Sequence, residues 1–222
     1  MVVLIKVKKY LYIALIPFFA SMILNFPFPD VNPYGETIVS VFDIPVQSAN
    51  GINYVGITSL LLLILSLYLL VKSLKKYHFR LVITAIMLAI FTPTFVASSF
   101  QKTFATGIYA ISYELDDSKC SFEKTNETTL HGVCELPFKN YSKNDVQFTI
   151  EFYKRYSFED EIPMVSLMNN NAPYRVKLGG NGTKRVIIET NIDISKMENQ
   201  IDGGEATDVN IIIKSGRSSR KL

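Results

Sequence analysis

Residues 54–80 read YVGITSLLLLILSLYLLVKSLKKYHFR, and the organisation of the whole chain can be worked out from this stretch. The run 54–71 has no ionisable side chain other than tyrosine. A helix of that length crosses most of a bilayer's hydrocarbon core, and the run lacks the polar face of a soluble helix. Four basic residues follow it: Lys72, Lys75, Lys76 and Arg80. The stretch therefore predicts a membrane-spanning helix that ends in positive charge.

Two further apolar runs lie on either side, at residues 10–28 and 81–100, and neither carries a formal charge. Pro17 and Pro93 lie inside them, and membrane helices tolerate proline better than soluble ones do. We expect three transmembrane spans in a membrane domain that covers residues 1–100.

The first span has an alternative interpretation as a cleaved signal peptide. Lys6, Lys8 and Lys9 would form its basic region, followed by an apolar region. However, residues 20–22 match a cleavage site poorly, and the apolar run continues to Phe28. Retention as an anchor is favoured.

Basic residues set the expected orientation. They precede the first span and fill the connection 72–80, whereas the loop 29–53 has no Lys or Arg and carries Asp30, Glu36 and Asp43. Positive charge stays in the cytoplasm, so the N-terminus and the connection 72–80 are expected inside and the loop 29–53 outside. Three crossings then place everything after Phe100 outside the plasma membrane.

The two halves of the chain differ in charge. Residues 1–100 hold seven Lys/Arg and three Asp/Glu, and the remainder holds sixteen and seventeen. The overall net charge of +3 is thus no sign of nucleic-acid binding, and none is expected. The three spans contain no Asp, Glu, His, Lys or Arg, the residues that usually handle ions in transporters, so a transport function is not expected.

The loop 29–53 contains the run TIVSVFDIPV at residues 37–46. Its β-branched and aromatic content, closed by Pro45, predicts a strand. The run would either lie on the membrane surface or dock onto the C-terminal domain, and docking is slightly favoured because it would cover apolar side chains.

From residue 101 the apolar pattern changes from continuous to alternating, which is typical of strands. Seven short strands with turn signals between them favour an immunoglobulin-like or fibronectin-like β-sandwich over residues 101–214, with a frayed basic tail at 215–222. Their inward residues are Tyr109, Ile111, Tyr113, Leu115; Leu130, Gly132, Cys134, Leu136, Phe138; Val146, Phe148, Ile150, Phe152; an edge strand at Ile162–Leu167; Tyr174, Val176, Leu178; Val186, Ile188, Thr190, Ile192, Ile194; and Val209, Ile211, Ile213.

The segment GVCELPFKNYS at residues 132–142, which leads into Val146–Tyr153, resembles the central hairpin of Ig-like modules on bacterial cell surfaces. In those modules a Lys-Asn-x-Ser turn joins two core strands. The buried tryptophan of antibody domains is absent, since the chain has no Trp. The resemblance implies a sandwich and no particular activity.

Candidate chemical sites are few. Cys120 and Cys134, the two cysteines, could form a disulfide that stabilises the domain by about 3 kcal/mol, or remain as two free thiols. An oxidising compartment favours the disulfide. His131 has no companion for a metal or catalytic site, so no metal, cofactor or catalytic residue is expected. Glu159–Glu161 would form a weak calcium site at most.

These features favour a non-enzymatic interaction module, tethered in the lipid bilayer, that binds another envelope component as an accessory or sensor subunit. Its partner would be an envelope protein or polymer, or a second copy of the chain. One alternative is an envelope enzyme or lipid-handling protein with a site between loop 29–53 and the sandwich. Another is a protein that protects against a membrane-active toxin.

Overall fold

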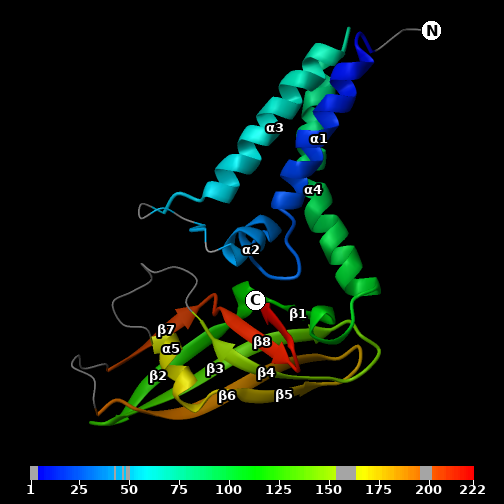
Figure 1. Cartoon of the computed structure of the whole chain (residues 1–222). Coiled ribbons are helices and arrows are strands. Elements are labelled where there is room, and N and C mark those ends of the chain that lie inside the picture. The colour runs from blue at the N-terminus through cyan, green and yellow to red at the C-terminus, as the bar shows by residue number, and fades with distance from the viewer. Residues whose placement is uncertain (1–4, 43, 47, 49–50, 154–163, 196–201) are drawn as a thin grey trace. The chain divides into compact units, whose positions relative to one another are not determined.

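A computed structural model describes residues 5–42, 44–46, 48, 51–153, 164–195 and 202–222. The chain divides into two compact units, Met1–Ser99 and Phe100–Leu222. Helices make up the first unit, and two antiparallel sheets dominate the second (Figure 1).

The first unit contains the helices α1 (Lys8–Leu24), α2 (Tyr34–Val41), α3 (Tyr54–Ser73) and most of α4 (His78–Thr103). By length and composition, α3 and α4 could each cross a membrane. Helix α1 has 17 residues and is about 26 Å long, at the short end of the range for a span. It ends at Leu24 because Pro27 and Pro29 follow and cannot continue a helix. A third span therefore stays a prediction.

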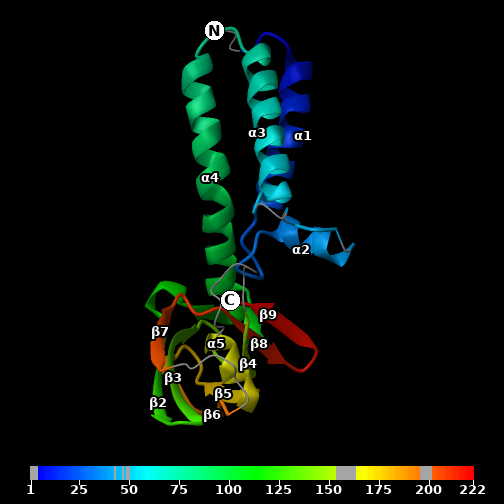
Figure 2. The same cartoon turned by 90° about the vertical axis from the view of Figure 1, so that its left-hand side faces the viewer.

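Helices α1 and α3 lie side by side, and small polar residues line their contact (Figure 2). Ser59 and Ser66, seven positions apart on α3, are both buried. The Ser59 hydroxyl lies 3.0 Å from that of Ser21, and the Ser66 hydroxyl donates to the Ala14 backbone oxygen at 2.9 Å. Short side chains let the two backbones approach, and these bonds satisfy the hydroxyls in apolar surroundings.

The strand predicted at residues 37–46 is wrong, because the segment Tyr34–Val41 forms helix α2. Helix α2 satisfies its own backbone groups, whereas a single strand here would need a partner edge. Gly35 also permits a close approach: a Cβ there would lie 2.6 Å from Val55 Cγ1. Asp43 of this loop lies outside the described residues.

In the second unit, β3 (Thr129–Asn140) is the central strand of the first sheet. One edge of β3 pairs with β6 (Thr183–Asp193). The other edge pairs with β1 (Ile111–Tyr113) and β2 (Lys119–Asn126), and β7 (Gly203–Thr207) extends the sheet beyond β2. The second sheet has the order β5 (Tyr174–Leu178), β4 (Val146–Phe152), β8 (Ile211–Ser215), β9 (Ser218–Lys221).

Both sheets contribute to one hydrophobic core. The inward faces predicted for β3, β4 and β6 are confirmed, and Leu130, Leu136 and Ile150 are fully buried. Alternate residues of each strand point to opposite faces, so the polar residues between them point outward.

Four expectations for this unit need correction. Tyr109 and Leu115 lie in the short helices η1 (Gly107–Ala110) and η2 (Leu115–Asp117), so the first strand is shorter than expected. The edge strand expected at Ile162–Leu167 is instead the helical turn α5 (Met164–Leu167), followed by η3 (Met168–Asn171), while residues 162–163 lie outside the described residues. Strands β2 and β7 were not expected. The tail expected to be frayed at 215–222 instead contains the strand β9, Ser218–Lys221.

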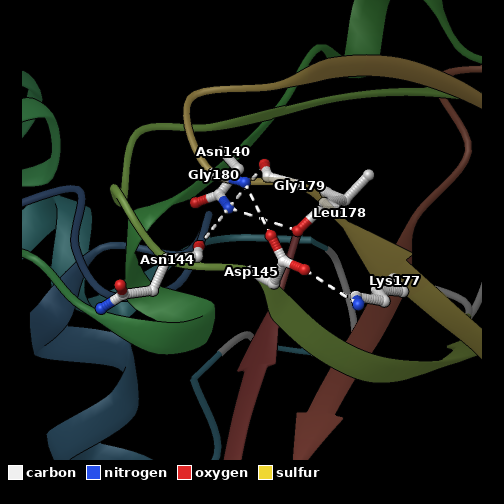
Figure 3. Close-up of polar contacts among 7 residues, drawn as sticks. All are labelled: Asn140, Asn144, Asp145, Lys177, Leu178, Gly179 and Gly180. Atoms are coloured by element: carbon white, nitrogen blue, oxygen red, sulfur yellow. Dashed lines mark hydrogen bonds and ion pairs between the residues drawn. The ribbon is translucent and has the colours of Figure 1, made fainter.

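The Lys-Asn-x-Ser segment is not a hairpin turn, because it leads from β3 in one sheet to β4 in the other. Asn140 is fully buried there, and its amide donates to the backbone oxygens of Asn144 and Gly179 at 2.9 and 3.0 Å. Figure 3 shows how this side chain ties the corner after β3 to the turn after β5. Gly180 is required in that turn, since a Cβ would lie 2.1 Å from the Lys143 backbone oxygen.

Candidate functional site

A hollow of about 430 Å³ lies on the outward face of the second sheet. It is lined by Gln147, Phe148 and Thr149 of β4, Arg175, Val176 and Lys177 of β5, and Lys214, Ser215 and Gly216 at the end of β8. Three of these residues are basic, and none is acidic, histidine or cysteine.

The pairing of the strands arranges the basic side chains around Thr149. Thr149 is opposite Arg175 of β5 on one side and opposite Lys214 of β8 on the other. Neighbouring strands lie about 4.8 Å apart, so the Cα atoms of Arg175 and Lys214 are about 10 Å apart across the sheet. Long side chains can bridge that span, and both cations can therefore reach one group seated over Thr149.

Two of the three cations have acidic partners outside the hollow. Lys177 Nζ lies 2.9 Å from Asp145 Oδ2, as Figure 3 shows, and Lys214 Nζ lies 2.6 Å from Glu151 Oε2. The Lys177 ammonium, with a bond from the Gly180 backbone N–H, lowers the pKa of Asp145, and Asp145 raises the pKa of Lys177. Arg175 is exposed and has no such partner within the described part of the chain.

This arrangement suits the binding of an anion. A guanidinium presents a planar set of donors that matches carboxylate and phosphate oxygens, and the lysines add positive charge nearby. The Thr149 and Ser215 hydroxyls already bond to the backbone oxygens of Lys214 and Gln147, at 3.5 and 2.8 Å. Their lone pairs remain available as acceptors only, so the basic side chains would supply the donors to an anion.

The outward face of the first sheet has a different character. Glu135 lies 3.2 Å from Lys119 and 3.1 Å from Arg185, and these bonds lower the pKa of its carboxyl. His131 Nδ1 lies 2.8 Å from the side-chain oxygen of Asn191. In the part of the chain that the structure describes, no three His, Cys, Asp or Glu side chains lie close enough to hold a metal ion.

The predicted cysteine pair is brought together. Cys120 of β2 is directly opposite Cys134 of β3, and a disulfide of 1.94 Å joins their sulfur atoms. Both cysteines are buried in the core. The disulfide is therefore a structural link between two paired strands.

The basic residues predicted to set the topology also lie together. Ile5 pairs with Leu74, and the Lys6 backbone N–H donates to the Ser73 oxygen at 2.7 Å. The segment that carries Lys6, Lys8 and Lys9 is therefore next to the one that carries Lys72, Lys75, Lys76 and Arg80. Six of the seven thus lie at the same end of the α1–α3 pair, and Arg80 follows in the first turn of α4.

No family model, no curated protein and no solved structure matches this chain. Arg175 and Lys177 could have been found from the sequence, because they alternate with the inward residues Tyr174, Val176 and Leu178. The sequence could not predict that β5 and β8 flank β4, since this order depends on pairing between distant segments.

Proposed function

We propose that the chain is a membrane-tethered module. Its second unit, Phe100–Leu222, here called the β unit, lies outside the cell and binds an acidic envelope component through the basic hollow. The observation that carries the proposal is the pair Arg175 and Lys214 on either side of Thr149, on a sheet face whose hollow has no acidic lining residue. The partner is another envelope protein or polymer, or a second copy of the chain.

The proposed anchor has three spans, α1, α3 and α4. Helices α3 and α4 are long and apolar enough to cross a membrane, and α1 accompanies α3 along its length. The gathering of the basic residues at one end of α1 and α3 supports a cytoplasmic position for that end. After three spans, the β unit would follow on the outside, where a disulfide such as Cys120–Cys134 persists.

The β unit is proposed to be an Ig-like sandwich. The order β9-β8-β4-β5 corresponds to strands G-F-C-C′ of that fold, and β2-β3-β6 corresponds to A-B-E. Strand D has no counterpart among the described strands, and β7 adds an edge beyond β2. In this correspondence the hollow lies on the G-F-C-C′ sheet.

A photo-crosslinking amino acid at Gln147, an exposed position in the hollow, tests the binding face in intact cells that make the full chain. We expect an adduct of higher mass, and we expect it to be lost when Arg175→Gln and Lys214→Gln are combined. The matched control combines Arg185→Gln and Lys119→Gln on the other sheet, and it should leave the adduct unchanged.

The same crosslinker at Ser121, on the outward face of β2, should give no adduct. An adduct of twice the chain's mass would identify a second copy as the partner. Recovery of the bare monomer alone, or an adduct that survives the Arg175/Lys214 change, would refute the proposed binding face.

Orientation is tested with single added cysteines, Ser219→Cys on β9 and Lys75→Cys in the connection before α4. A membrane-impermeant maleimide applied to intact cells should label the first and spare the second until the cells are broken. The reverse pattern would overturn the external placement.

A further inference from the structure

Helix α2 has an apolar face that its unit leaves partly exposed. Tyr34, Ile38 and Val41 are 40%, 39% and 75% exposed, and Phe42, just after the helix, is 69% exposed. Spaced at i, i+4, i+7 and i+8, these residues form one stripe on the helix. So large an apolar fraction on a short surface helix indicates a partner other than water.

A different face of α2 rests on the ends of its neighbouring helices. Gly35 is buried, and a Cβ there would lie 2.6 Å from Val55 Cγ1 and 2.9 Å from Leu24 Cδ2. Leu24 is the last residue of α1, and Val55 is the second of α3. Helix α2 is therefore held at the level where one long helix ends and the next begins, and Figures 1 and 2 show it crosswise to them.

The polar residues of α2 occupy the side opposite the apolar stripe. With 3.6 residues per turn, Glu36 and Ser40 fall roughly opposite Tyr34, Ile38 and Val41. The Glu36 carboxylate accepts a bond of 2.5 Å from the Asn53 amide at the start of α3. Helix α2 thus has an apolar side, a packed side and a polar side in that order around its axis.

We propose that α2 lies in the plane of the outer membrane interface, with its apolar stripe inserted among the lipid acyl chains and Ser40 toward water. This inference rests on the proposed membrane anchoring. Helices of this kind bury their apolar side to a depth of roughly 5–10 Å.

Two features of the helical unit favour lipid over protein as the occupant. Packing through Gly35 holds α2 at the ends of two helices that lipid would surround. Tyr34 and Tyr54, both partly exposed, flank the same level, where tyrosine is enriched in membrane proteins. Because the loop 29–53 has no Lys or Arg, insertion would depend on apolar area and not on attraction to anionic lipids.

The chain contains no tryptophan, so a single introduced Trp reports its own surroundings. The full chain is reconstituted in phosphatidylcholine vesicles that carry bromine either near the headgroup or near the acyl-chain end. Val41→Trp should emit at short wavelength and lose more fluorescence to the shallow bromine than to the deep one. Phe42→Trp, on the same side, repeats the measurement at a second position.

Ser40→Trp is the matched control on the polar side and should emit at longer wavelength with little quenching. Leu61→Trp, on the exposed flank of α3, should be quenched most by the deep bromine and reports the anchoring itself. If Leu61→Trp is quenched and neither α2 stripe position is, the interfacial placement of α2 is wrong and the anchoring stands. If none of these tryptophans is quenched, both the membrane anchoring and the interfacial placement of α2 are wrong.

Discussion

Arg220 Nη1 donates a hydrogen bond of 2.6 Å to the backbone oxygen of Ile111, although 109 residues separate them. The same nitrogen lies 3.3 Å from the backbone oxygen of Ile108. Arg220 is only 6% exposed. Arg220, the penultimate residue of β9, therefore fixes the position of residues 108–111 near the start of the β unit.

Arg220→Ala should destabilise the β unit by about 1.5–3 kcal/mol, because it removes a buried charged donor from the backbone oxygens of Ile108 and Ile111. Urea denaturation of the full chain in detergent, followed by the near-UV circular dichroism of its tyrosines, would measure the loss. Arg217→Ala, in the exposed turn before β9, is the control and should change stability by less than about 0.5 kcal/mol. Equal midpoints for the two variants would contradict this role for Arg220.

The strands that the sequence predicts well are those with several inward apolar residues, such as Val146, Phe148, Ile150 and Phe152 in β4. Strand β9 reads Ser-Ser-Arg-Lys, with no large apolar residue, and its inward residue is Arg220. From the sequence alone, a charged residue in so polar a segment is predicted to be solvated. The burial of Arg220 follows only from the pairing of β9 with β8. Strand β7, which reads GGEAT, escapes prediction for the same reason.

The disulfide between Cys120 and Cys134 closes a separation of 14 residues, so its loss should cost about 3 kcal/mol. Urea denaturation of the wild-type chain with and without dithiothreitol would measure this. The double variant Cys120→Ala/Cys134→Ala should unfold at lower urea and should not respond to the reductant. A wild-type midpoint that dithiothreitol does not move would show that the disulfide contributes no stability.

Only part of the candidate site could be predicted from the sequence. Arg175 and Lys177 were predictable as outward residues of one strand, because alternation fixes their side. Lys214 was not grouped with them, because β8 follows β5 by more than thirty residues and meets it only through β4. The helix α2 was missed for another reason: its β-branched residues suggest a strand, but packing of Gly35 on Val55 overrides that local preference.

Gly180→Ala should destabilise the β unit by about 1–3 kcal/mol, since the added Cβ would lie 2.1 Å from the Lys143 backbone oxygen and force the corner apart. Its neighbour provides a matched control. A Cβ on Gly179 would meet nothing nearer than 3.9 Å, so Gly179→Ala should change stability by less than about 0.5 kcal/mol. Urea denaturation under the same conditions compares the two variants. Equal losses of stability would show that the backbone around Lys143 can shift to accommodate the added Cβ.

The ion pair between Asp145 and Lys177 predicts opposite effects at the two ends of the pH range. Lys177 and the Gly180 N–H lower the folded-state pKa of Asp145, so its contribution is present above the ordinary carboxyl pKa and lost as the pH falls through the folded value. Asp145 raises the pKa of Lys177, so that contribution is lost as the pH rises through the folded value of the lysine.

Asp145→Asn should therefore flatten the loss of stability as the pH falls below about 4, relative to wild type. Lys177→Met should flatten the alkaline loss instead, and it should also weaken the acid dependence because Asp145 loses its main partner. Both groups are exposed, so added salt should shrink the wild-type effect toward that of the variants. If Asp145→Asn leaves the loss of stability at acid pH unchanged, another carboxyl causes that loss. Glu135 is then the first to test, because its pKa is also lowered.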